Sequence, residues 1–179
     1  MHYRCQTQLL GSYRFIVKTL LVLRHAKSSW KDQERSDHDR PLSKRGQRDA
    51  PRMGQLIAER RVLPDVIVSS TAKRANRTTE AVVGEIEETV SVQHDRRLYL
   101  ANSAEVVDVL RDIGGCSRCV MVVGHNPGLE NLVTRLTGIA ESLPTAALAE
   151  IQLPIRSWKT LTLTSAGQLN GIWCPRELD

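Results

Sequence analysis

The chain of 179 residues is long enough to bury one α/β domain well and too short for two. Apolar residues make up 41% and charged residues 25%, as in ordinary globular proteins, and the net charge of +5 favours an anionic partner. Aromatic residues are scarce at 4% and are not interleaved with basic residues, which argues against a nucleic-acid partner.

Alternating apolar patterns run along the chain. Short aliphatic runs are typical of buried parallel strands, and apolar residues three and four apart are typical of helices. The expected elements are strand 19–24, helix 44–60, strand 65–69, helix 72–87, strand 89–92, helix 104–113, strand 119–123, helix 127–137, and strand-like runs 147–153, 158–164 and 168–173. This order predicts a single-domain three-layer sandwich of the α/β class. Its doubly wound sheet is mostly parallel, and the last runs add one or more antiparallel edge strands.

Residues that favour helix ends support these boundaries. Ser43 suits the N-cap of the first helix, and either Asn102 or Ser103 suits that of the third. Pro127 fits the first turn of the fourth helix. Pro51 is expected to kink the first helix or to delay its regular start.

Neither a membrane segment nor a metal site is expected. No apolar run reaches the roughly 18 residues of a membrane span, and the N-terminus lacks the apolar core and cleavage site of a signal peptide. We therefore expect a cytoplasmic protein; its oligomeric state cannot be predicted from the sequence. Cys116 and Cys119 form a lone CxxC pair with no second pair to complete a zinc site, so we interpret it as structural or accidental.

Basic and imidazole side chains follow three of the expected strands. Arg24 and His25 follow the first strand, Arg74 lies just past the second, and His125 follows residues 119–123. Ligands of open α/β sheets bind beyond the carboxyl ends of the strands, so we expect these side chains to share one rim. Arginine forks fit phosphate oxygens and a neutral imidazole can act as a nucleophile, so the set suits phosphoryl transfer.

Four segments carry a resemblance to a known family: Arg24–Trp30, Asp39–Gly46, Ser69–Ala75 and Gly124–Gly128. Their order and spacing resemble the histidine phosphatase superfamily, with its phosphoglycerate-mutase-like fold, over residues 18–178. The first segment, the Leu98-Tyr99 pair and the end Ile172–Leu178 are similar to the SixA-type phosphohistidine phosphatases.

The resemblance implies roles for the strand-end residues. His25 becomes the nucleophile that carries the phosphoryl group, and water then hydrolyses the phosphohistidine; neither metal nor cofactor is implied. A backbone carbonyl should hold one ring nitrogen of His25, so that the other keeps its lone pair. The expected phosphate-binding residues are Arg24, Arg74, His125, Ser28 and Asn126.

The proton donor of the family is not evident in this chain. Many relatives carry an acidic residue after the third strand that protonates the leaving alkoxide. Asp95 and Glu105 are the candidates here, with Tyr99 a distant third. An imidazole leaving group titrates near neutrality and needs less help from an acid. Links around the rim are also short, which favours an open pocket.

The leading interpretation is a phosphatase for a phosphohistidine-bearing protein of a phosphorelay or phosphotransferase system. The first alternative is a phosphomonoesterase for a small phosphorylated metabolite, and the second is a phosphate-binding or phosphoprotein-binding module without turnover. The preferred leaving group separates the two enzymes.

The first 17 residues form an extension, because members of the family begin just before the first strand. Two interpretations are open. Residues 1–17 are a disordered tail, or they are a start-site artefact in which Val17 is the true first residue, translated from a GTG codon. The domain itself is expected over residues 18–179, and N-terminal sequencing of the native protein distinguishes the two interpretations.

Overall fold

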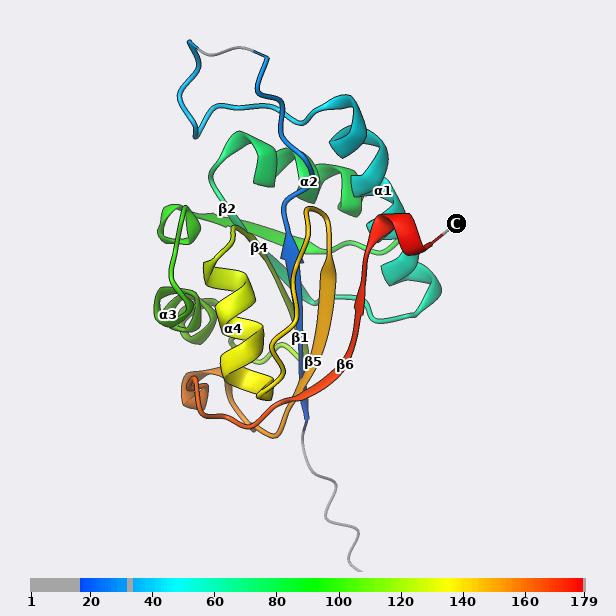
Figure 1. Cartoon of the computed structure of the whole chain (residues 1–179). Coiled ribbons are helices and arrows are strands. Elements are labelled where there is room, and N and C mark those ends of the chain that lie inside the picture. Colours follow the sequence, from blue (N-terminus) through cyan, green and yellow to red (C-terminus); the bar gives the residue numbers. More distant parts are fainter. Residues whose placement is uncertain (1–16, 32–33, 179) are drawn as a thin grey trace, which may run out of the picture.

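A central sheet with helices on both faces forms the molecule (Figure 1). The computed structural model describes residues 17–31 and 34–178, so the expectation for the N-terminal extension falls almost wholly outside the described residues. The described elements are β1 (Lys18–Arg24), α1 (Lys44–Glu59), β2 (Val66–Ser70), α2 (Lys73–Val83), β3 (Ser91–Asp95), η1 (Arg96–Leu98), α3 (Ser103–Ile113), β4 (Cys119–Gly124), α4 (Gly128–Thr137), β5 (Leu148–Leu153), η2 (Trp158–Thr160), β6 (Gln168–Trp173) and η3 (Pro175–Glu177).

In the described part of the chain, six strands form one sheet in the order β3-β2-β4-β1-β5-β6. The first four strands in this order are parallel, whereas β5 pairs antiparallel with β1 and β6 pairs antiparallel with β5. The predicted α/β sandwich with a mostly parallel sheet and antiparallel strands at one edge is therefore confirmed.

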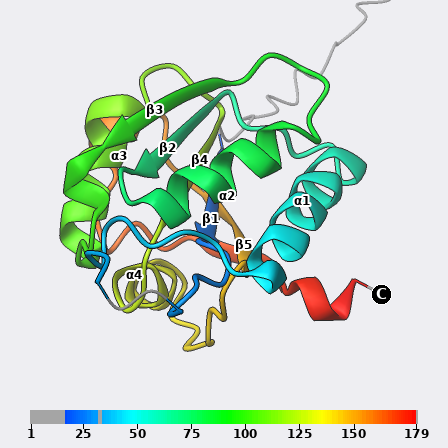
Figure 2. The same cartoon turned by 90° about the horizontal axis from the view of Figure 1, so that it is seen from above.

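The two helical layers bury opposite faces of the same strands. Seen from above, α1 and α2 lie on one side of the sheet, and α3 and α4 lie on the other (Figure 2). Leu20 and Val22 of β1 pack in the cluster that includes α3 and α4, while Leu21 and Leu23 pack in the cluster that includes α1 and α2. Because successive side chains alternate between faces, a strand covered on both sides is aliphatic throughout.

Capping explains where two of the helices begin. The Ser43 hydroxyl accepts the backbone N–H of Gly46 at 3.2 Å, and α1 is regular from Lys44. Of the two effects predicted for Pro51, the delayed start is therefore wrong, and a kink stays a prediction. Asn102 is the N-cap of α3, as one of the two alternatives predicted, and it forms a capping box with Glu105.

The structure corrects three of the predicted elements. The strand expected over residues 89–92 is β3 at Ser91–Asp95. Helix α2 ends at Val83 rather than at residue 87, because Gly84 is a poor helix former and becomes the C-cap. The predicted strand 158–164 is instead the short helix η2 followed by a loop. Its apolar signal comes from Trp158, Leu161 and Leu163. Trp158 and Leu161 are fully buried, and Trp158 donates its indole N–H to the Ser117 carbonyl at 2.8 Å.

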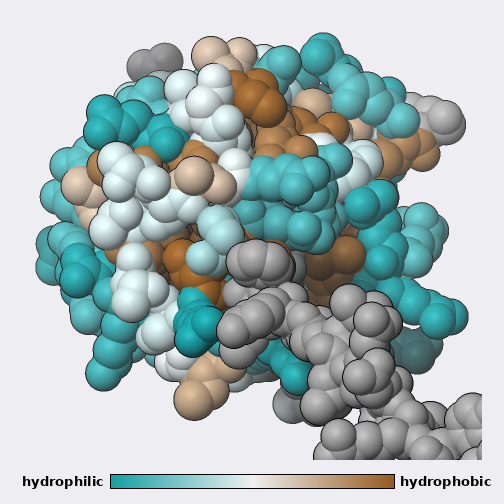
Figure 3. Space-filling model, turned by 90° about the horizontal axis from the view of Figure 1, so that it is seen from below, coloured by the Kyte–Doolittle hydropathy of each residue, from teal (hydrophilic) through white to brown (hydrophobic). Residues whose placement is uncertain are grey.

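Apolar residues on the helices and at the lower end of the molecule (Figure 3) form no large continuous area in the described residues. Within the described residues, no helix is long and apolar enough to cross a membrane. Figure 3 shows the lower end of the molecule, where small hydrophobic areas are separated by polar residues. Scattered apolar residues of this kind are normal for a protein surface and mark no particular site.

Strand register brings three carboxyl ends to the same edge of the sheet. Arg24 at the end of β1 is paired with Gly124 at the end of β4, and Ser69 of β2 is paired with Val123 of β4. The residues that follow these strands therefore emerge side by side, as open parallel sheets require of a binding edge.

Candidate active site

The two histidines of the predicted site lie against each other. His25 and His125 each come one residue after the paired residues Arg24 and Gly124, and their ring centroids are 4.9 Å apart. Both are buried, with 8% and 4% of their surfaces exposed. The backbone N–H of His25 donates to the Gly124 carbonyl at 3.0 Å, which holds the two segments together.

A backbone carbonyl orients the His25 ring. Nδ1 lies 2.8 Å from the carbonyl oxygen of Ala26, and since a carbonyl only accepts, Nδ1 carries the hydrogen. The lone pair is then on Nε2, which accepts the Nε–H of Arg74 at 3.2 Å. A backbone carbonyl thus holds one ring nitrogen of His25, as predicted, and the other keeps its lone pair, which accepts from Arg74.

His25 is neutral at physiological pH. Burial lowers its pKa to about 4, and the positive charges of Arg74 and Arg24 add to this effect, although the hydrogen bond to Ala26 opposes it. A neutral imidazole keeps the lone pair that a nucleophile needs. The ring is thus both oriented and uncharged in the free protein.

Arg74 is buried and connects His25 to Asp37, a loop residue that lies outside the predicted site. Its Nη2 donates to the Asp37 carboxylate at 2.9 Å, and its Nη1 donates to the Asp37 backbone carbonyl. The same carboxylate accepts from Tyr99 Oη at 2.9 Å and from Arg40 Nη1 at 2.8 Å. The spacing of three residues between Asp37 and Arg40 was the available signal in the sequence.

Asp37 is ionised in this arrangement. Partial burial would raise its pKa, but the hydrogen bond from Tyr99 and the charge and hydrogen bond of Arg74 together bring the pKa below its ordinary value. The carboxylate therefore acts as an acceptor that holds the Arg74 fork in place.

The other predicted arginine, Arg24, donates through Nη1 to the Leu143 carbonyl at 2.7 Å, whereas its buried Nε has no partner in the described structure. Burial lowers the pKa of the guanidinium, and the charge of Glu130 partly offsets this. A buried N–H without a partner is unfavourable, and an anion oxygen would satisfy it.

His125 also has one ring nitrogen in use. Its Nε2 is 2.8 Å from the hydroxyl oxygen of Ser70, and its buried Nδ1 has no partner in the described structure. Burial lowers its pKa to about 3, with further contributions from His25 and Arg74. The structure thus brings His25, Arg24, Arg74 and His125 together, and these four residues are the candidate quartet.

Among the described residues, the Ser28 and Asn126 side chains form no hydrogen bond with a quartet residue and are linked to the quartet through other residues. Ser28 is buried and accepts from Arg40 Nη2 at 3.2 Å. Asn126 donates to the Leu143 carbonyl at 3.0 Å, the same oxygen that accepts from Arg24. Direct contact of either side chain with phosphate remains a prediction.

The structure does not bring the two predicted proton donors to the quartet. Asp95 accepts from the backbone and side chain of Arg97, and this lowers its pKa although partial burial opposes the shift. Glu105 accepts the N–H of Asn102 at 2.8 Å in the capping box of α3. Both carboxylates therefore have structural partners, and their role as acids stays an untested prediction.

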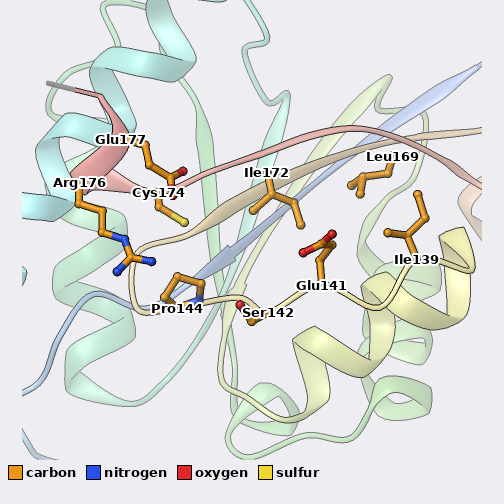
Figure 4. Close-up of a pocket in the computed structure, with 9 residues that line it drawn as sticks. All are labelled: Ile139, Glu141, Ser142, Pro144, Leu169, Ile172, Cys174, Arg176 and Glu177. Carbon is orange, nitrogen blue, oxygen red and sulfur yellow. The ribbon is translucent and has the colours of Figure 1, made fainter.

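Other candidate groups lie apart from this edge. In the described ranges, no group of three or more His, Cys, Asp or Glu side chains is arranged to hold a metal ion. Cys116 and Cys119 are free, and burial raises the pKa of Cys119 to about 12. The hollow in Figure 4 lies between β6 and the segment before β5, and no quartet residue lines it. Its lining residues are Ile139, Glu141, Ser142, Pro144, Leu169, Ile172, Cys174, Arg176 and Glu177.

Sequence comparison finds a family for this chain. Residues 20–99 match the model of the histidine phosphatase superfamily (branch 1). An uncharacterized chloroplastic protein of Arabidopsis thaliana is 33% identical over 172 residues, which cover 89% of this chain and 79% of that protein. The uncharacterized protein Rv1276c of Mycobacterium tuberculosis is 32% identical over 142 residues, covering 73% and 87% of the two chains.

Structural comparison agrees with the family match. A structure from Agrobacterium tumefaciens, described as a phosphohistidine phosphatase SixA, has a TM-score of 0.76 and 27% identity over 88% of this chain and 98% of that chain. The protein histidine phosphatase SixA with bound tungstate shares the fold, with a TM-score of 0.74 and 22% identity over 90% and 99% of the chains. The chain therefore belongs to the histidine phosphatase superfamily and is a hydrolase acting on phosphorylated substrates.

Proposed function

We propose that the protein is a phosphohistidine phosphatase that acts on a histidine-phosphorylated protein. His25 is the nucleophile, and Arg24, Arg74 and His125 bind the phosphoryl oxygens. The orientation and neutrality of the His25 ring support the first role. The unpartnered N–H of Arg24 and the buried fork of Arg74 support the second.

The observation that carries the choice of leaving group is the ionised state of Asp37. Among the described residues, Asp37 is the one carboxylate that forms hydrogen bonds with a member of the quartet. Its carboxylate oxygens accept from Arg40, Arg74 and Tyr99, so it is ionised and holds no proton to give at neutral pH. An alkoxide leaving group needs such a proton, whereas an imidazole can leave with much less help. The quartet therefore fits phosphohistidine better than an alkyl phosphate.

The reaction follows from these positions. Nε2 of His25 attacks the phosphorus, the bond from phosphorus to the substrate imidazole breaks, and that imidazole leaves with the electron pair and takes a proton from water. In the free protein the Nε–H of Arg74 donates to the Nε2 lone pair of His25. This N–H must donate to a phosphoryl oxygen instead before Nε2 can attack. Water then attacks the phosphorylated His25, which releases phosphate and restores the ring.

Similarity to SixA proteins supports the same substrate class. Two of the structural neighbours at 27% identity carry the SixA name. Tungstate in a third neighbour is a tetrahedral oxyanion with the shape of phosphate. A corresponding anion on the quartet of this chain would satisfy the buried Nε–H of Arg24.

The test compares leaving groups on the same enzyme. Phosphate release from a histidine-phosphorylated carrier domain is measured beside p-nitrophenyl phosphate and a panel of sugar and nucleoside phosphates. We expect kcat/KM to favour the carrier domain by orders of magnitude. His25→Ala should abolish turnover of every substrate, while His94→Ala, which changes an exposed histidine on β3, should leave it unchanged.

Three outcomes would contradict the proposal in different ways. A small ester as the best substrate would identify a metabolite phosphomonoesterase. Wild-type turnover in His25→Ala would remove His25 from the nucleophile role. Tight binding of the phosphorylated carrier domain without any release of phosphate would indicate a phosphoprotein-binding module.

A further inference from the structure

We propose that Ser70 is a positioning residue for the reaction, because its hydroxyl sets which nitrogen of His125 carries the hydrogen. The inference rests on the proposed function in one respect, namely that His125 faces the phosphoryl group. The hydroxyl oxygen of Ser70 lies 2.8 Å from His125 Nε2, and both residues are buried. Ser70 donates to this nitrogen, so the hydrogen of His125 is on Nδ1.

The donor direction follows from the other contacts of Ser70. Its oxygen accepts the backbone N–H of Ala72 at 3.3 Å, and the side chain is completely buried. A hydroxyl has one hydrogen to donate and two lone pairs. If His125 also donated to this oxygen, the Ser70 hydrogen would have no acceptor among the described residues. Donation from Ser70 to Nε2 satisfies both buried groups, as buried polar atoms require.

The other ring nitrogen of His125, Nδ1, is then a hydrogen-bond donor. Burial keeps the ring neutral, so it carries a single hydrogen. With Nε2 accepting from Ser70, that hydrogen sits on Nδ1, which is buried and has no partner in the described structure. Nδ1–H is a donor that a phosphoryl oxygen can accept. In the opposite tautomer a lone pair would face the oxygen and repel it.

Ser69 provides an internal comparison. It precedes Ser70 on β2, is equally buried, and points to the opposite face because side chains alternate along a strand. Its hydroxyl donates to the Ser70 carbonyl at 3.1 Å and not to His125. Of these two neighbouring hydroxyls, Ser70 is the one that contacts the quartet.

Kinetics of three variants test the positioning role. Ser70→Ala should lower kcat/KM by about 10-fold to 100-fold, the loss seen when the partner that orients a metal-ligating histidine is removed. The loss should lie mainly in kcat, since the hydrogen bond matters most as charge develops on the phosphoryl oxygens. Ser70→Thr keeps a hydroxyl and should recover most of the activity, and Ser69→Ala should stay near wild type. Equal losses in Ser70→Ala and Ser69→Ala would overturn the proposal.

The tautomer is measured directly on the unmodified protein, so the test does not depend on a variant folding. Two-bond ¹H–¹⁵N NMR spectra distinguish a histidine with hydrogen on Nδ1 from one with hydrogen on Nε2. His125→Asn assigns the resonance. Hydrogen on Nδ1 in the wild type supports the inference, and hydrogen on Nε2 overturns it. This spectrum is independent of substrate preference, so the proposed function can fail while the tautomer assignment stands.

Discussion

The two buried neutral histidines should make the stability of the fold depend on pH, and His25→Asn tests this. The pKa values of His25 and His125 are lowered by burial to about 4 and about 3. In the unfolded chain both rings titrate near 6.5, so below that pH the unfolded state binds more protons than the native state. Stability is therefore fully present above about pH 6.5 and is lost as the pH falls toward the native pKa values.

The magnitude follows from the size of the shift. Each pKa unit corresponds to about 1.4 kcal/mol, so the slope from the two rings together rises from near zero above about pH 7 toward a limit of roughly 2.7 kcal/mol per pH unit near pH 5. His25 alone loses roughly 3 kcal/mol of stability between pH 6.5 and its native pKa of about 4. His25→Asn removes one titrating ring and should halve this slope, a change of about 1 kcal/mol per pH unit averaged between about pH 7 and about pH 5.

Urea denaturation from about pH 7 down to about pH 5 measures these slopes. Ile57→Val is the control, because it trims a buried side chain of α1 and should lower the free energy of unfolding by about 0.5–1.5 kcal/mol equally at every pH. A His25→Asn slope equal to that of the wild type would refute the reasoning. A wild-type stability that stays flat between these pH values would refute it as well.

Three substitutions elsewhere probe the scaffold. Gly128→Ala should destabilise the fold by about 3 kcal/mol or more and reduce kcat, because a Cβ there would meet the Ala101 carbonyl oxygen at 1.8 Å. An unchanged urea midpoint together with unchanged turnover would contradict this. Asn102→Ala should cost about 1 kcal/mol of stability through the lost cap of α3, read from the urea midpoint, with kcat preserved. Trp158→Phe should cost about 1–3 kcal/mol in the same assay by losing the hydrogen bond to Ser117, and a smaller effect would mean that this bond adds little.

The amino-acid sequence by itself determined the sheet core and the edge that carries the site. The aliphatic runs of β1 and β4 are local patterns, and their short length and continuous apolar character favour strands buried on both faces. Arg24, His25 and His125 follow directly from the ends of these strands, so their meeting at one edge could be predicted before any contact was known.

Tertiary structure alone decided the partners of these residues. Asp37 lies in the link between β1 and α1, which is longer than the short links expected around the rim. Its approach to Arg74 and Tyr99 depends on the path of that link over the sheet edge (Figure 1). The bond from Ser70 to His125 joins residues 55 positions apart. No local periodicity encodes such contacts, because they depend on which side chains the folded backbone brings within hydrogen-bonding distance.

The segment around Trp158 shows the same limit in the fold itself. Its apolar residues match the pattern of a strand, but the indole fills the space beside Gly114, where a Cβ would lie 2.2 Å from the ring. The short helix η2 buries the Trp158 side chain completely, so the segment has no need to form a strand. A hydrophobic pattern specifies that a segment is buried, whereas the shape of the remaining core decides the backbone conformation that buries it.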